Sequence, residues 1–196
     1  MCYRLEHNNQ ILNIKGCFIA NAINLGNYKL SENSNLDYHL LNSAQTNCFQ
    51  IETIMQVNKL VVEKTAALPI FKYYNTSGDK LHFSFDGEKF VAKYETFNAK
   101  YSSKYFGTEK GLVDLSMILN GVAVNFRVIG AHEREGHYVF DMIFNNNTDL
   151  EPDWVSGDMH VINRINFALL DFRNIEFMPC YRSVSRQTKN LCGFKS

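Results

Sequence analysis

The stretch Leu81–Phe90 (LHFSFDGEKF) decides the fold, because an apolar run typical of a β-strand ends here on an acid and a glycine. A second apolar segment, Asp153–Asp158 (DWVSGD), ends in much the same way. We predict that both segments are strands and that Asp86 and Asp158 stand at their ends. If the two strands lie parallel and adjacent, both carboxylates reach the edge of the sheet where open α/β folds bind ligands.

The other segments predict a mixed sheet preceded by helices. Residues 1–74 read as a helical region, and a turn cluster at 75–79 separates it from 75–196. Asn120-Gly121 lies between two apolar runs, 112–119 and 122–128, and predicts a hairpin with a type I′ turn. The later elements are predicted as a helix over 133–144, a strand up to 158, a helix over about 162–172 and a strand over 175–178. Strand, hairpin, helix, strand, helix, strand is the order of a ribonuclease-H-like fold, with 94–110 as an insertion.

The composition is that of one compact core. The sequence has 196 residues, of which 45% are apolar. No uninterrupted apolar run approaches the roughly 18 to 20 residues that span a bilayer, so we expect a cytoplasmic protein with no membrane contact. Five cysteines without a Cys-x-x-Cys spacing argue against a disulfide framework or a zinc knuckle. The formal net charge of zero restricts any nucleic-acid surface to a local patch.

Two carboxylates at one sheet edge are suited to phosphoryl transfer. In this reaction negative charge builds on the attacking and leaving oxygens, and two divalent ions about 4 Å apart stabilise that charge. Mg²⁺ prefers oxygen ligands, so Asp86 is predicted to bridge both ions and Asp158 to hold one of them. Gly87 would let backbone and substrate approach closely. The alternative is that Asp86 and Gly87 simply form a turn.

Several motifs resemble those of the catalytic core of the Tn3 family of replicative transposases. The segment Phe85–Phe90 (FDGEKF) is similar to the family's Ser-Asp-Gly-Gln-Lys/Arg-Phe, which carries the first catalytic acid. Gly157–Val161 (GDMHV) is similar to Thr-Asp-Thr-His-Gly, which carries the second acid, and Phe177–Arg182 (FMPCYR) is similar to Phe-Ala-Pro-Arg-Ile-Arg. Segments 20–26 and 132–141 also match, so the resemblance covers most of the chain. Substitutions within the motifs suggest a divergent copy that keeps both acids.

The resemblance implies a DDE-type transposase that uses two divalent ions, Mg²⁺ or Mn²⁺, to cut transposon ends and to join the freed 3′-hydroxyl to target DNA. Asp86 and Asp158 would be the catalytic and metal-binding acids. The partners would be transposon-end DNA, target DNA and further transposase copies. The family completes its site with a distant glutamate, and Asp171 and Glu176 are expected too far from the metals to replace it. We therefore expect a truncated core that does not transpose DNA by itself.

Two other functions stay open from the sequence. In ribonucleases of this fold, an acid on the first helix helps to complete the metal site, and Glu133 or Glu135 would lie near the start of the equivalent helix. Either one would make the chain a small metal-dependent nuclease. The alternative for both is a solvent-exposed acid in a first helical turn, where the helix dipole favours it. The second function is that of a folded transposase remnant that performs no chemistry.

Contacts with DNA phosphates are predicted for a few cations near these motifs. His160 follows Asp158 by two residues and would steady a phosphate or the aspartate, or would simply be a surface histidine. Lys89 follows the first acid. Arg182 and Arg186 belong to a C-terminal segment that contains no acid, and this segment reads equally well as a solvated tail.

Overall fold

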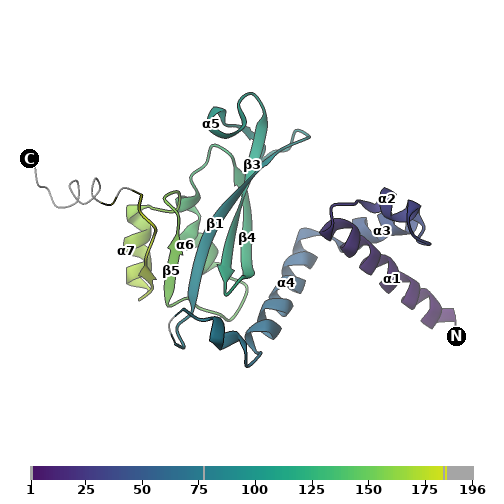
Figure 1. Cartoon of the computed structure of the whole chain (residues 1–196), viewed down its shortest axis with the longest axis horizontal. Helices are drawn as coiled ribbons and strands as arrows, with labels where there is room; N and C mark the ends of the chain where they lie inside the picture. The colour runs from purple at the N-terminus through teal and green to yellow at the C-terminus, as the bar shows by residue number, and fades with distance from the viewer. Residues whose placement is uncertain (1, 77, 183, 185–196) are drawn as a thin grey trace, which may run out of the picture. The chain divides into compact units, whose positions relative to one another are not determined.

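A computed structural model describes residues 2–76, 78–182 and 184 of the chain, and its contacts group the chain into two compact units (Figure 1). The units are Met1–Asn58 and Lys59–Ser196. The division falls within helix α4 (Ile51–Ala66), so the second half of this helix and the short helix η1 (Phe71–Tyr74) belong with the sheet. Separate domains at 1–74 and 75–196 stay a prediction.

The first unit is helical, as predicted. Its helices are α1 (Cys2–Ala22), α2 (Asn27–Glu32), α3 (Tyr38–Cys48) and the first half of α4. Helix α1 ends where Asn24 adopts a φ of 52° and the N–H groups of Leu25 and Gly26 both donate to the Ala20 carbonyl. Cys17, Ala20 and Leu41 are fully buried and form the small core of this unit. No helix in the described part of the chain is long and apolar enough to cross a membrane.

The second unit contains a mixed sheet with the strand order β2-β3-β1-β5-β6, and β4 also pairs with β3. The strands are β1 (His82–Val91), β2 (Lys100–Tyr101), β3 (Lys110–Leu119), β4 (Val122–Gly130), β5 (Trp154–Gly157) and β6 (Glu176–Phe177). Strand β1 is antiparallel to β3 and parallel to β5, and β5 is parallel to β6. This arrangement is compatible with a ribonuclease-H-like fold and confirms the predicted fold class.

The predicted hairpin is confirmed. Asn120 has a φ of 50° and Gly121 a φ of 79°, and a type I′ turn needs positive values at both positions. The Asn120 amide also donates to the Phe71 carbonyl over 3.3 Å and to the Asn75 side chain over 2.7 Å. The turn is thereby tied to η1. The predicted insertion at 94–110 contains β2 and the short helix α5 (Ser103–Phe106).

Strand β1 is longer than predicted, because it does not end at Asp86. Pairing with β3 continues from Asp86, opposite Ser116, to Val91, opposite Gly111. The parallel partner β5 stops earlier, at Gly157, which lies opposite Phe85. Asp86 and Gly87 therefore lie inside a strand and do not form a turn.

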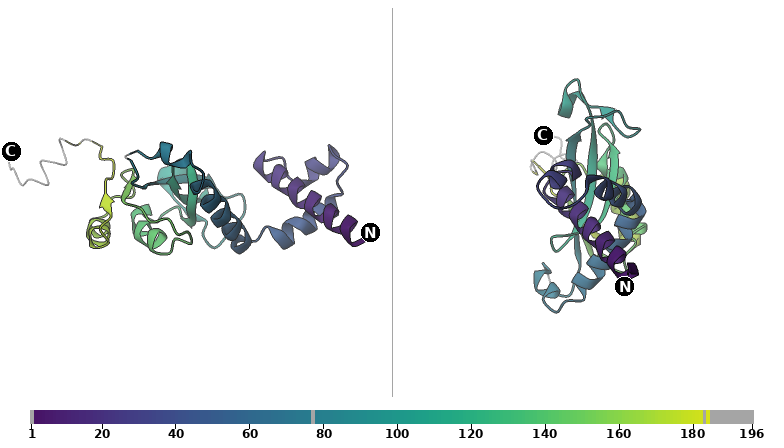
Figure 2. Two further views of the ribbon diagram at one scale, coloured as in Figure 1. Left: turned by 90° about the horizontal axis from the view of Figure 1, so that it is seen from below. Right: turned by 90° about the vertical axis from the view of Figure 1, so that its right-hand side faces the viewer.

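Helices cover one face of this sheet. They are α6 (Val139–Phe144) and α7 (Arg164–Phe172), which Figure 2 shows on the same side of the sheet, and a short helix η2 (Glu135–His137) precedes α6. Phe83 and Phe85 of β1 point to this side and are buried in one cluster with Val139 and Leu170. Intervening β1 residues such as Ser84 lie on the other face and are half-buried or exposed.

The helix predicted over 133–144 is wrong at its start, because α6 begins only at Val139. The cause is Gly136, whose N–H donates to the His160 carbonyl over 3.1 Å. A side chain at this position would place its Cβ 2.9 Å from the Val161 carbonyl oxygen. This contact between η2 and the loop after β5 replaces the first turn of the predicted helix. Glu133 and Glu135 consequently lie before α6.

Candidate functional site

The two predicted acids follow the last pair of the parallel ladder between β1 and β5. That pair is Phe85 and Gly157, on strands that run about 4.8 Å apart. Asp86 comes one residue later within β1, and Asp158 is the first residue after β5. Residues alternate between faces along a strand, and Phe85 is only 2% exposed whereas Asp86 is exposed. Asp158 is exposed as well. The register therefore brings the backbone at both acids to the same level of neighbouring strands.

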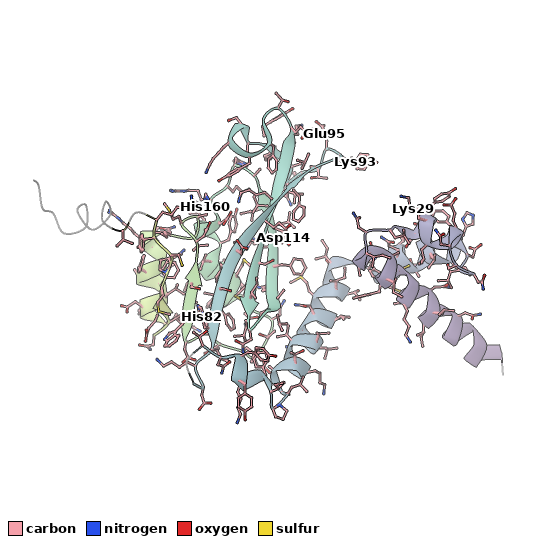
Figure 3. The ribbon with its side chains drawn as sticks, viewed as in Figure 1. Lys29, His82, Lys93, Glu95, Asp114 and His160 are labelled. Atoms are coloured by element: carbon pink, nitrogen blue, oxygen red, sulfur yellow. The ribbon has the colours of Figure 1, made fainter. Side chains whose placement is uncertain are left out.

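The Asp158 carboxylate is held by its own loop. Its Oδ1 accepts a hydrogen bond of 2.7 Å from the His160 N–H, and its Oδ2 lies 4.0 Å from His160 Nε2. Figure 3 shows His160 near one end of the sheet and His82 near the other. Asp86 makes no side-chain hydrogen bond or ion pair within the described residues, so its carboxylate is available to a ligand.

Two carboxylates of this kind fit a hard divalent cation. Mg²⁺ is commonly held by one or two carboxylates together with substrate phosphates and water. No group of three or more histidine, cysteine, aspartate or glutamate side chains that could hold a metal ion occurs among the residues that the structure describes. The described residues thus offer no closed structural metal site, and metal binding by Asp86 and Asp158 stays a prediction.

Glu135 lies on the opposite side of β1 from Asp86. Its side chain is buried, and a Cβ built on Gly87 would lie 2.5 Å from Glu135 Cδ. Lys89 forms an ion pair with Glu135, with 3.4 Å between Lys89 Nζ and Glu135 Oε1. The alternative interpretation of Glu135 as a solvent-exposed acid is therefore wrong. The buried carboxylate is compensated by Lys89, as a buried charge requires.

Glu133 lies in the loop before η2, and its carboxylate holds this loop together through two hydrogen bonds. Its Oε1 accepts a 3.2 Å hydrogen bond from the Gly130 N–H, and its Oε2 accepts one from the Tyr138 hydroxyl. Both carboxylate oxygens therefore have protein partners. A role for Glu133 or Glu135 as third metal ligand stays a prediction.

The insertion contributes Tyr105 to a pocket of about 460 Å³ beside Lys89 and Glu135. Lys89 Nζ lies 4.8 Å from the centre of the Tyr105 ring, and the ring of His160 lies 6.4 Å from it, edge to face. Lys89 and His160, both predicted to contact DNA, are thus brought together with an aromatic ring. The sequence did not single out Tyr105 for this position, since only tertiary structure brings residue 105 next to residues 89 and 160.

The remaining predicted cations lie beyond β6. Arg182 follows the end of β6 at Phe177 by five residues, and Arg186 lies outside the described residues. On the face of the sheet away from α6 and α7, the half-buried Asp114 stands directly opposite Glu88. Burial, and then the charge of Glu88, raise the pKa of the Asp114 carboxyl above its usual value.

Comparisons with known proteins agree with the sequence motifs. Residues 4–196 match the family described as Tn3 transposase DDE domain. The chain is 25% identical over 168 residues to the transposase for transposon Tn4556 of Streptomyces fradiae, an alignment that covers 85% of this chain and 18% of that protein. The chain thus spans about a fifth of the length of that curated relative. Because the family match extends over nearly the whole sequence, the chain belongs to the Tn3 transposase DDE domain family.

Proposed function

We propose that this chain supplies Asp86 and Asp158 as the metal-binding acids of a transposase core that acts on DNA. The observation that carries the proposal is the register of β1 and β5, in which both acids directly follow the last parallel pair. The family uses divalent metal ions. Two ions, Mg²⁺ or Mn²⁺, would stabilise the charge that develops on the attacking and leaving oxygens during phosphoryl transfer.

The residues around the two acids have separate proposed roles. The hydrogen bond from the His160 N–H orients the Asp158 carboxylate. The Lys89 ammonium and the His160 ring, together with Arg182 and Arg186, are proposed contacts for DNA phosphates. The proposed partners are transposon-end DNA, target DNA and further copies of the transposase, as in DNA transposition by the family to which the chain belongs.

Titration with Mn²⁺ tests the metal site directly. We expect the purified chain to bind Mn²⁺ in isothermal titration calorimetry, and Asp86→Asn and Asp158→Asn each to weaken binding at least about tenfold, the loss typical even of an outer-shell partner. Asp171→Asn is the matched control, because Asp171 is an exposed acid on α7, away from the ends of β1 and β5. Equal affinity in all four proteins would contradict the proposal.

The same titration separates the alternative functions. A chain that binds no Mn²⁺ is a folded remnant. Binding without cleavage of DNA is the result expected if Asp86 and Asp158 hold the metal without a third acid from this chain. Metal-dependent cleavage that is lost in Glu133→Ala or Glu135→Ala would instead make the chain a nuclease.

A further inference from the structure

A second pocket, of about 370 Å³, lies next to the one beside Lys89 and is lined by cations without any acid. Its charged and titratable side chains are Arg134, His137, His160 and Arg164. The pocket beside Lys89, in contrast, also contains Glu133 and Glu135. An anion is therefore favoured in the second pocket more strongly than in the first.

Neither arginine of this pocket has a partner in the described part of the chain. Arg134 and Arg164 are exposed, and their guanidinium groups make no ion pair or hydrogen bond with described residues. Arg164 is also the first residue of α7, where the positive end of the helix dipole disfavours a cation. The first turn of α7 contains no acid that would offset this charge. A bound anion would relieve both unfavourable features.

The walls of the pocket are held in place by a buried amide. Asn166 is only 3% exposed, and its Nδ2 donates to the Gly136 carbonyl over 2.6 Å and to the Val161 carbonyl over 3.3 Å. The Gly136 N–H donates in turn to the His160 carbonyl. These bonds connect η2, the loop after β5 and α7, which are the three segments that carry the lining residues. The backbone segments that carry the cations are thus held together before any ligand binds, which lowers the cost of binding.

We propose that this pocket binds a phosphate of the DNA backbone next to the position that Asp158 serves. The inference rests on the proposed function, since the phosphate would belong to the DNA strand that is proposed to bind at Asp86 and Asp158. Guanidinium groups form paired hydrogen bonds with phosphate oxygens, and two of them with two imidazoles match a phosphodiester better than a neutral ligand. His160 lines this pocket and also bonds to Asp158, so the phosphate would lie beside the metal-binding acids.

Fluorescence anisotropy with a short fluorescein-labelled DNA duplex of arbitrary sequence tests the pocket. We expect Arg134→Gln and Arg164→Gln each to weaken binding about three- to tenfold and to lower the slope of log K against log salt by about one. Arg173→Gln is the matched control, because it removes the same charge from the residue after the other end of α7, where Arg173 faces Glu151 at 3.9 Å. The control is expected to change affinity less than about twofold.

Asn163→Asp separates a loss of binding from a loss of structure. Asn163 lines the pocket and caps α7, since its Oδ1 accepts a 3.0 Å hydrogen bond from the Ile165 N–H. Aspartate caps a helix as well as asparagine does, so thermal unfolding should be unchanged or shifted upward. DNA binding should nevertheless weaken at least about threefold, because the substitution places an acid among the cations.

The outcomes distinguish this inference from the function on which it rests. If the arginine variants and Asn163→Asp bind the duplex as tightly as the unaltered chain does, or if Arg173→Gln loses as much affinity, the pocket is not a phosphate site. That result leaves DNA binding and the Mn²⁺ site intact. A chain that binds no DNA at all overturns the proposed DNA partner and the pocket together, while Mn²⁺ binding still reports on Asp86 and Asp158.

Discussion

At the scale of single residues, Gly87 separates two carboxylates that have different environments. Asp86 is exposed on one face of β1, whereas Glu135 lies buried against the other face at the level of Gly87. The sequence suggested that Gly87 leaves room for a substrate. In the structure, the side chain of Glu135 fills that space, and the Lys89 ammonium neutralises the charge of the Glu135 carboxylate.

This contact predicts a strong coupling between Gly87 and Glu135. Gly87→Ala should destabilise the protein by about 1–3 kcal/mol, because the new Cβ would lie 2.5 Å from Glu135 Oε1 and force a buried group to move. In a Glu135→Ala background the same change should be nearly neutral, since alanine suits a strand better than glycine. Urea unfolding of the four proteins in a double-mutant cycle gives the coupling. An equal effect of Gly87→Ala in both backgrounds would refute the contact.

A second prediction concerns the like charges of Glu88 and Asp114, which stand opposite each other on β1 and β3. The pKa of Asp114 is raised in the folded protein, by burial first and by Glu88 second. The unfolded chain therefore releases this proton at lower pH than the native protein does. Stability falls as pH rises from the usual pKa of aspartate through the raised one, and the loss persists at neutral pH.

Glu88→Gln should recover part of this loss. We expect it to raise the free energy of unfolding at neutral pH by about 0.5 kcal/mol, in the range of cross-strand charge pairs, and to leave stability unchanged at a pH below the usual value for aspartate. Glu109→Gln removes an exposed acid that has no ion pair within the described residues and serves as the control. Urea unfolding at several pH values measures both, and equal effects of the two substitutions would argue against repulsion between Glu88 and Asp114.

At the scale of elements, the sequence predicted what local chemistry determines. The hairpin was predictable because Asn120-Gly121 favours positive φ whatever surrounds it. The end of β1 was not, because Asp86-Gly87 reads locally as a turn and only pairing with β3 keeps it extended. The start of α6 was missed for a similar reason, since Gly136 contacts a loop more than twenty residues away in sequence, at His160 and Val161.

The turn of this hairpin gives an element-scale prediction. Gly121→Ala should destabilise the protein by about 1–2 kcal/mol, because an L-residue at a φ of 79° is strained. Gly121→Asn should lose less than half as much, since asparagine tolerates this conformation. Thermal unfolding of the two variants provides the comparison. Equal losses would indicate that the turn contributes through packing rather than through its backbone conformation.

At the scale of the whole molecule, the sequence predicted that the strands before Asp86 and Asp158 are neighbours, but not which side chains from other elements lie near them. The predicted strand order makes β1 and β5 parallel neighbours, and Asp86 and Asp158 each directly follow the last pair between them, although β1 itself continues to Val91. The cation-lined pocket combines Arg134, before α6, with Arg164, at the start of α7. Each arginine alone looks like an ordinary surface charge in the sequence, so the cluster becomes visible only when η2 and α7 are placed together.

The extent of the folded sheet unit is the last prediction. Val62 of α4 and Phe71 of η1 are 2% and 7% exposed and belong to the core cluster that contains Phe83. Burial of each such side chain stabilises the fold by about 1.5–3 kcal/mol, so a fragment of residues 75–196 should be about 3–6 kcal/mol less stable than one of residues 50–196.

Single substitutions in α4 test the same contact. Val62→Ala should destabilise the full chain by at least about 1 kcal/mol, whereas Val61→Ala, at a position 52% exposed, should change the free energy of unfolding by less than about 0.5 kcal/mol. Urea unfolding of the two fragments, the two variants and the unaltered full chain gives these differences. Equal stability of the two fragments would show that 75–196 is a domain of its own and that α4 contributes nothing to its core.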